Sequence, residues 1–94
     1  MGKELSTKQA SDLFGAILSL KTKKECQIFF RDLCTLSEIK GMVDRFQVAK
    51  MLQGNIPYRT ISKKTGSSTA TITRIAHWVH HGMGGYKLIL KRIK

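Results

Sequence analysis

The chain has 94 residues, of which 41% are apolar, so it is long enough for one small domain with a modest core. Seventeen Lys and Arg residues against six Asp and Glu give a net charge of +11. Residues 55–94 contain eight basic side chains and no acidic one, which favours a nucleic acid as partner. An anionic membrane is a weaker alternative, because no segment combines a basic face with a broad aromatic and leucine face.

The sequence also argues against several classes of protein. No charged region is followed by an uninterrupted apolar run, so we expect neither a signal peptide nor a membrane span. Cys26 and Cys34 have no partners at metal-ligand spacing and are predicted to be buried thiols in the reducing cytoplasm. No Ser-His-acid set, Cys-His pair or carboxylate pair has a catalytic spacing, so we predict that the protein is not an enzyme and needs no cofactor.

The first two predicted elements are amphipathic helices. Ser6 begins a capping-box pattern before an apolar stripe with steps of three and four residues, which predicts a helix over about 7–20. Thr22, followed three residues later by Glu25, repeats that pattern and predicts a helix over about 23–34.

A third helical segment is predicted from Ser37, its candidate cap, to the break at Gly54-Asn55. Its apolar stripe changes phase near Phe46, which leaves open a division into a short helix and a longer one. No strand-like alternation, repeat or linker is found, so we predict a single all-α domain over residues 1–94. The helices carry more apolar surface than a chain of this length buries alone, which favours an intimate homodimer.

Residues from about 57 to 80 have the pattern of a helix-turn-helix. Pro57 suits the first turn of a helix over 57–65, and Gly66 follows where a left-handed turn residue is needed. Ser67 or Ser68 can cap the next helix, whose short hydroxyl side chains can approach base edges and phosphates. The residues of this helix expected to face inward are Ile72, Ile75, Ala76 and Val79.

The C-terminal part offers three histidines and a last basic helix. His77, His80 and His81 lie close along the chain, but no Cys or carboxylate follows nearby, so we predict no metal site. Trp78 is expected to pack in the core or in a dimer interface. Residues 86–94 predict an amphipathic helix that ends with Lys94.

One long segment resembles a known family. The stretch "TLSEIKGMVDRFQVAKMLQGNIPYRTISKKTGSSTATITRIAHWVHHGMGGYKLIL", about 35–90, resembles the Trp repressor (TrpR) superfamily. "STATITR" is its most specific piece, and "GMGGYKLIL" is more similar to the YerC/YecD-like branch. The resemblance implies a Trp-repressor-like helical fold and an intertwined homodimer on double-stranded DNA. By analogy with the tryptophan repressor, it also implies a palindromic operator with half-sites about one helical turn apart.

The resemblance assigns roles to residues of the helix-turn-helix. It makes Thr69, Ala70, Thr71 and Thr73 the groove-facing edge and makes Arg59 a backbone or base-edge contact. Ser62 stands where the tryptophan repressor has a DNA-contacting lysine, a contact that the neighbouring Lys63 can supply. Taken with the basic and hydroxyl pattern, the residues that we predict to bind DNA are Arg59, Ser62, Lys63, Lys64, Ser67, Ser68, Thr69, Ala70, Thr71, Thr73 and Arg74.

Two arginines are candidates for a ligand or anion site. Arg74 matches the arginine that closes over the corepressor in the tryptophan repressor, and Arg45 matches its second ligand arginine in one of two alignment registers. Ile75 and Trp78 replace a glycine and a serine near that ligand, so we predict that tryptophan does not act as corepressor. An unidentified small-molecule effector stays open, as does a contact of both arginines with the DNA backbone.

These patterns predict a sequence-specific DNA-binding transcription regulator, specifically a repressor, that acts as a homodimer in the cytoplasm. Two alternatives stay open because they fit parts of the same pattern: a non-specific nucleoid-type DNA binder and a protein-interaction module.

Overall fold

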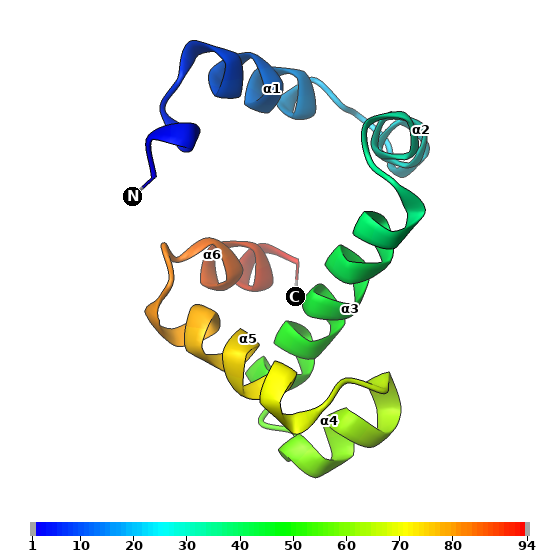
Figure 1. Cartoon of the computed structure of the whole chain (residues 1–94), viewed down its shortest axis with the longest axis vertical. Coiled ribbons are helices and arrows are strands. Elements are labelled where there is room, and N and C mark those ends of the chain that lie inside the picture. The colour runs from blue at the N-terminus through cyan, green and yellow to red at the C-terminus, as the bar shows by residue number, and fades with distance from the viewer. Residues whose placement is uncertain (1, 94) are drawn as a thin grey trace. The chain divides into compact units, whose positions relative to one another are not determined.

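The computed structural model describes residues 2–93, which contain helices and no strand (Figure 1). The predicted all-α fold is therefore confirmed, while Lys94 lies outside the described residues. No helix in this part of the chain is long and apolar enough to cross a membrane. The elements are η1 (Lys3–Leu5), α1 (Lys8–Leu18), α2 (Lys23–Leu33), α3 (Leu36–Gln53), α4 (Tyr58–Thr65), α5 (Thr69–His81) and α6 (Gly85–Arg92).

A threonine side chain caps α2, as the sequence predicts, and another caps α1. Thr22 Oγ1 accepts a hydrogen bond from the backbone N–H of Glu25 at 3.0 Å. At α1 the cap is Thr7, whose Oγ1 accepts from the N–H of Ala10 at 3.0 Å. The prediction of Ser6 was wrong because the Ser6 hydroxyl donates backwards to the carbonyl of Lys3, at the end of η1.

The cap of α3 is Thr35, two residues before the predicted Ser37. Thr35 Oγ1 accepts from the N–H of Glu38 at 3.1 Å, and Glu38 Oε1 accepts from the N–H of Thr35 at 2.8 Å. This reciprocal pair is a capping box, which satisfies two backbone donors at once. Ser37 was a wrong choice because it already lies inside the first turn of α3.

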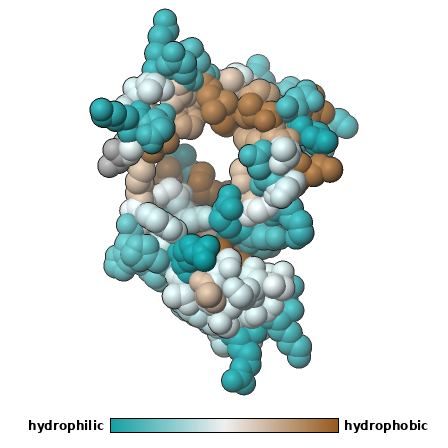
Figure 2. Space-filling view, in the orientation of Figure 1, coloured by the Kyte–Doolittle hydropathy of each residue, from teal (hydrophilic) through white to brown (hydrophobic). Residues whose placement is uncertain are grey.

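The chain divides into two compact units, and the boundary falls within α3 between Ile39 and Lys40. Among residues 2–39, the described part of the first unit, none is buried, although α1 and α2 are both amphipathic. Phe14 is 48% exposed and Leu18 is 86% exposed, and apolar side chains gather at the surface over α1 and α2 (Figure 2). Cys26 is also exposed, so its predicted burial was wrong within a single chain, because this unit has no core of its own.

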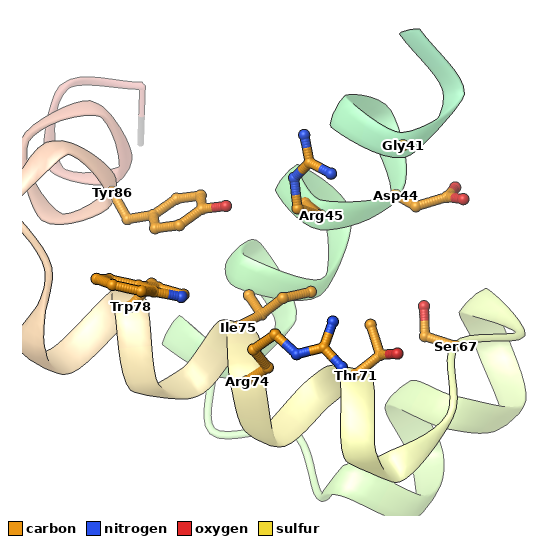
Figure 3. A pocket seen from close by; sticks show the side chains of 9 residues that line it. All are labelled: Gly41, Asp44, Arg45, Ser67, Thr71, Arg74, Ile75, Trp78 and Tyr86. Carbon is orange, nitrogen blue, oxygen red and sulfur yellow. The ribbon is translucent and has the colours of Figure 1, made fainter. Parts of the chain in front are cut away.

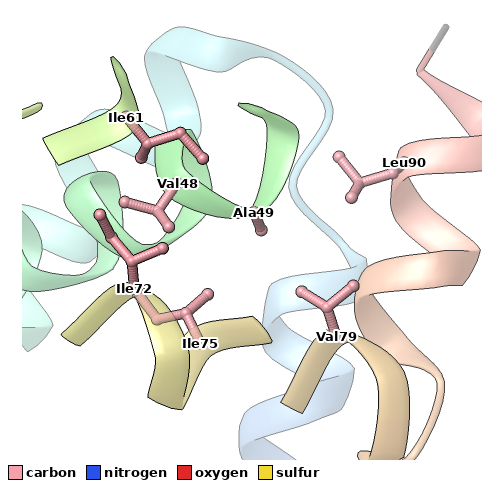
Figure 4. Close-up of a cluster of buried hydrophobic side chains, with 7 residues drawn as sticks. All are labelled: Val48, Ala49, Ile61, Ile72, Ile75, Val79 and Leu90. Carbon is pink, nitrogen blue, oxygen red and sulfur yellow. The ribbon is translucent and has the colours of Figure 1, made fainter. Parts of the chain in front are cut away.

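The second unit holds the core (Figure 4). Side chains of four helices meet there, and those of Val48, Ile61 and Ile72 are fully buried. The four residues of α5 that were expected to face inward are all buried, which confirms that prediction. The core residues are Val48 and Ala49 of α3, Ile61 of α4, Ile72, Ile75, Ala76 and Val79 of α5, and Leu90 of α6.

Helix α3 is continuous through Phe46, so the division that the sequence left open does not occur. The change of apolar phase has a different cause. Met42 and Val43, before Phe46, stay exposed, whereas Val48 and Ala49, after it, enter the core of the second unit. One helix therefore carries an exposed apolar face before Phe46 and a buried apolar face after it.

Candidate nucleic-acid interface

The corner between α4 and α5 depends on one glycine. Gly66 follows α4 with φ of +79°, the left-handed conformation that the sequence predicts for this position, and its N–H donates to the carbonyl of Ser62 at 2.9 Å. Ile61 on α4 and Ile72 on α5, both fully buried, anchor the two sides of the corner. The helices are thereby fixed to the core on their inner sides while their outer sides face solvent.

Three hydroxyl hydrogen bonds hold the turn. Ser62 Oγ donates to the carbonyl of Ser67 at 2.7 Å, across the turn. Thr65 Oγ1 donates to the carbonyl of Ile61 at 2.8 Å and accepts from the N–H of Ser67 at 3.1 Å. Ser62, a predicted DNA contact, is half-buried, and its proton is used inside the turn.

Of the two candidate caps of α5, Ser68 is the one used. Its Oγ accepts from the backbone N–H of Thr71 at 3.1 Å and donates to Thr71 Oγ1 at 3.0 Å. Thr73 Oγ1 donates to the carbonyl of Thr69 at 2.9 Å. Within residues 2–93, no hydrogen bond involves the Thr69 hydroxyl, so this group can donate and accept outside the chain.

The predicted groove-facing residues separate into two groups. Thr69, Ala70 and Thr73 are exposed on the first turns of α5, next to exposed Arg74. Thr71 is half-buried and faces a pocket together with Ser67. Most of the residues that were predicted to face the groove therefore lie on one exposed surface, whereas Thr71 faces the neighbouring pocket.

Cations flank this open surface. Arg59, Lys63 and Lys64 are all exposed on α4. The single ion pair within residues 2–93 joins Lys40 Nζ to Asp44 Oδ2 at 2.9 Å, so none of the cations on α4 has a carboxylate partner there. Unpaired cations on α4 and the free hydroxyl of Thr69 on α5 suit contact with a phosphate backbone.

Arg45 and Arg74 line one pocket of about 550 Å³ (Figure 3). Arg45 comes from α3 and Arg74 from α5, so residues 29 positions apart in the sequence share one site. Figure 3 shows the rings of Trp78 and Tyr86 at one end of the pocket and the hydroxyls of Thr71 and Ser67 toward the other. The remaining lining residues are Gly41, Asp44 and Ile75.

The pocket has an excess of positive charge. Asp44 is its one acid, and Lys40 pairs with that carboxylate. Arg45 and Arg74 have no carboxylate partner within residues 2–93. Ile75 is 5% exposed and forms part of the pocket wall. Its branched side chain therefore does not fill the pocket.

A second cavity of about 550 Å³ adjoins the first and shares Trp78 and Tyr86 with it. Sequence reasoning did not find this feature. The aromatic residue at 86 was visible only as part of an amphipathic stripe, and nothing along the chain indicated that it would face Trp78. The other lining residues are apolar or glycine: Phe46, Gly82, Met83, Gly85 and Ile89.

The three histidines lie at the C-terminal end of α5. The ring centroids of His77 and His81 are 5.2 Å apart, and those of His80 and His81 are 6.4 Å apart. In the part of the chain that the structure describes, no three metal-binding side chains come together. Trp78 beside them is 55% exposed, so within one chain it is not a core residue.

Comparisons with known proteins place this geometry in context. The model of the family described as Trp repressor protein matches residues 8–94. The uncharacterized protein YerC of Bacillus subtilis (strain 168) is 43% identical over 91 residues, which are 97% of this chain and 88% of YerC. Two crystal structures are also similar. One, of a TrpR-like protein from Eubacterium eligens, has a TM-score of 0.93 and 43% identity, covering 98% of this chain and 95% of that one. The other, of a candidate Trp repressor from Staphylococcus aureus, has a TM-score of 0.88 and 44% identity, covering 99% and 94%.

Proposed function

Because the chain belongs to the Trp repressor protein family, in the branch of YerC, we propose that it is a sequence-specific DNA-binding transcription regulator, a repressor acting as a homodimer. The observation that carries the proposal is the open hydroxyl edge at the start of α5, flanked by unpaired cations on α4. The family and the fold are of a regulatory DNA-binding type and do not suggest an enzyme. The proposed partner, chromosomal DNA, lies in the cytoplasm.

In this proposal, residues from about 57 to 80 act as a helix-turn-helix. The first turns of α5 enter the major groove, where Thr69, Ala70 and Thr73 meet base edges and thymine methyl groups. The N-terminus of α5, capped by Ser68, directs backbone N–H groups and a positive dipole end toward phosphate. Arg59, Lys63 and Lys64 neutralise neighbouring phosphates. These contacts fix the register on the duplex, while the α5 edge reads the sequence.

The proposed homodimer rests on the first unit of the chain. Its helices are amphipathic, yet Phe14, Leu18 and Ile28 stay largely exposed. An apolar face of this extent costs free energy in water, and a second copy of the same chain offers a matching face. A twofold dimer presents two α5 helices to DNA, which suits a palindromic operator.

The pocket around Arg45 and Arg74 is proposed as the site of a small-molecule effector. Two unpaired guanidinium groups favour an anionic ligand. Ile75 and Trp78 line the pocket where we expect a tryptophan-binding relative to have smaller residues, and on this ground we propose that tryptophan is not the corepressor. Micromolar binding of tryptophan by calorimetry would contradict it.

Two alternatives share some of these features. A non-specific nucleoid-type binder needs the same cations but no reading edge, and a protein-interaction module needs neither. The salt dependence of the affinity for DNA distinguishes the protein-interaction module from the two DNA-binding functions. If the dimer neutralises roughly six to ten phosphates, affinity for duplex DNA falls by about 10³-fold or more between about 50 and 200 mM salt. Fluorescence anisotropy of a labelled duplex measures this slope, and a flat slope would exclude DNA binding through these cations.

A further inference from the structure

The last turns of α5 bring two histidine rings together on an exposed face. His77 and His81 are four residues apart, and residues at this spacing are neighbours on a helix. Their ring centroids lie 5.2 Å apart, and both side chains are exposed. No ion pair within residues 2–93 involves either ring, and neither residue lines the arginine pocket. Both imidazole groups are therefore accessible to a ligand from solvent.

We propose that His77 and His81 together chelate one divalent ion of a late transition metal, such as Ni²⁺ or Zn²⁺, through one ring nitrogen each. Water fills the other coordination positions, so the site is open. The sequence argues against a closed structural site, which needs four protein ligands, and that argument does not apply to a chelate of two side chains. The proposal does not depend on DNA binding.

The spacing of the two histidines suits such a chelate. In helices with the pattern H-E-x-x-H, two histidines four residues apart bind one Zn²⁺ from the same face. Residues 77–81 read HWVHH, so the spacing is the same, but Trp78 stands where that pattern has its catalytic glutamate. Imidazole is a good ligand for nickel, copper and zinc. The pair therefore has the chemistry for binding a metal and lacks the general base for metal-assisted hydrolysis.

The backbone that carries the pair is held in a fixed conformation. Ala76 and Val79 are buried in the core on the inner side of α5. At the end of the helix, the N–H of Gly82 donates to the carbonyl of Trp78 at 3.0 Å, which closes the last turn. Because the folded helix keeps the two rings close, the second metal–nitrogen bond forms within one chain, at a high effective concentration.

Electrostatics and ligand type determine which ions are suitable. The C-terminal end of a helix carries a partial negative charge, which attracts a cation to the last turn of α5. The net charge of +11 opposes this attraction, so the two metal–nitrogen bonds must supply the affinity. Residues 55–94 contain no carboxylate that could add an oxygen ligand. Mg²⁺ and Ca²⁺, which prefer oxygen, are therefore not expected to bind.

The third histidine provides an internal control. The ring centroid of His80 lies 6.4 Å from that of His81, farther than the 5.2 Å between His77 and His81. In the described part of the chain, no three metal-binding side chains come together. His80 is exposed on the same helix turn but is assigned no bond to the metal.

Titration of the tag-free protein with NiCl₂ tests the site through Trp78, which is the only tryptophan. The ring centroids of His77 and Trp78 are 5.2 Å apart, so paramagnetic Ni²⁺ held by His77 should quench the tryptophan fluorescence. We expect saturable quenching that ends at one Ni²⁺ per chain. Excess Zn²⁺ should displace Ni²⁺ and restore the fluorescence, whereas Mg²⁺ should not. Absence of saturable quenching would overturn the proposal, and one Ni²⁺ per two chains would overturn a site made by a single helix.

Matched variants locate the metal. His81→Gln should weaken Ni²⁺ binding by about tenfold or more, because a single ring cannot chelate. His80→Gln should leave the affinity within about twofold of the original, and so should Cys26→Ser, which removes an exposed thiol that competes for Ni²⁺. Equal losses for His81→Gln and His80→Gln would overturn the assigned pair. A tenfold loss for Cys26→Ser would place the metal at the thiol instead.

Urea denaturation tests whether the helical spacing is needed. The two rings are held at this spacing only in the folded chain, so saturating Ni²⁺ should raise the urea midpoint of the original protein and of His80→Gln. The midpoint of His81→Gln should change much less. An unchanged midpoint for the original protein would mean that the unfolded chain binds Ni²⁺ equally well, which would overturn a chelate formed by the helix.

Discussion

The Ser and Thr hydroxyls of the α4–α5 corner have different structural roles, which could not be distinguished from the sequence. Ser62, Thr65 and Ser68 are used within the turn and the cap, whereas the hydroxyl of Thr69 makes no hydrogen bond within residues 2–93. Along the chain these side chains look alike. Their roles depend on which carbonyl or N–H lies within reach, and that is fixed only when the corner folds.

Thr69→Ala and Lys63→Ala should therefore weaken DNA binding in different ways. Loss of the free hydroxyl and methyl of Thr69 should reduce the preference at one base pair of each half-site by about 1 kcal/mol. Loss of Lys63 should weaken binding to all sequences and lower the slope of log affinity against log salt by about 1. Anisotropy titrations with the preferred duplex and with single-base variants measure both effects. A uniform loss for Thr69→Ala would contradict its reading role.

Gly66 can be tested against a glycine in ordinary helical conformation. Gly66→Ala should destabilise the protein by about 1 kcal/mol, because φ of +79° is unfavourable for a residue with a Cβ atom. Gly15→Ala is the matched control, since an added Cβ meets no atom within 4 Å at either position. Gly15 lies inside α1, so its substitution should be neutral or stabilising. Urea denaturation compares the two, and similar effects would argue against a backbone requirement at Gly66.

At the scale of the elements, the sequence predicted the helices well and their first residues less well. The corner was predicted closely, because Pro57 and Gly66 mark its limits with definite backbone requirements. The caps of α1 and α3 were misplaced by one or two residues, because several Ser and Thr lie next to each other there. Thr35 and Glu38 do have capping-box spacing, so this cap could have been found. The continuity of α3 could not be predicted, because its apolar residues before Phe46 stay exposed while those after it are buried in the core.

The capping box of α3 predicts a pH dependence. The backbone N–H of Thr35 donates to Glu38 and lowers the pKa of this carboxyl below its ordinary value of 4.5, and the Thr35 side chain lowers it further. A group whose pKa is lower in the folded state stabilises the fold at pH above its ordinary pKa. That contribution is lost as the pH falls through the folded-state pKa.

Thr35→Ala should bring the Glu38 pKa back toward its ordinary value, although only in part because the backbone N–H remains. Titration of the Glu38 side chain by NMR measures the shift. Glu38→Gln is the control for stability, and it should remove this component of the loss of stability at acid pH. An unchanged pKa in Thr35→Ala would show that the threonine side chain does not contribute.

At the scale of the whole molecule, the missing core of the first unit is the main observation. The sequence indicated an excess of apolar surface, and the structure locates that excess on α1 and α2. The resemblance placed Arg45, Arg74 and Trp78 near one ligand, but nothing in the sequence indicated that Tyr86 joins them, because that depends on how α3, α5 and α6 pack. Local patterns predict helices, whereas sites shared by distant segments need the packed chain.

Phe14→Asp tests the proposed homodimer. A charge on the apolar face of α1 should disfavour association, because the carboxylate would have to be buried between two chains. Ala16→Asp is the matched control, since it adds the same charge to the same helix away from the apolar stripe. Sedimentation equilibrium should give a two-chain mass for the original protein and for Ala16→Asp, and a lower mass for Phe14→Asp. A one-chain mass for the original protein would contradict the homodimer.

Selection from a pool of random duplex DNA tests sequence-specific binding most directly. The pool is incubated with the protein, bound duplexes are recovered and amplified, and the enriched sequences are read after several rounds. We predict enrichment of a palindromic sequence whose half-sites lie about one helical turn apart. Duplexes that bind with the expected salt dependence but show no enriched sequence would contradict a sequence-specific regulator and support a non-specific binder instead.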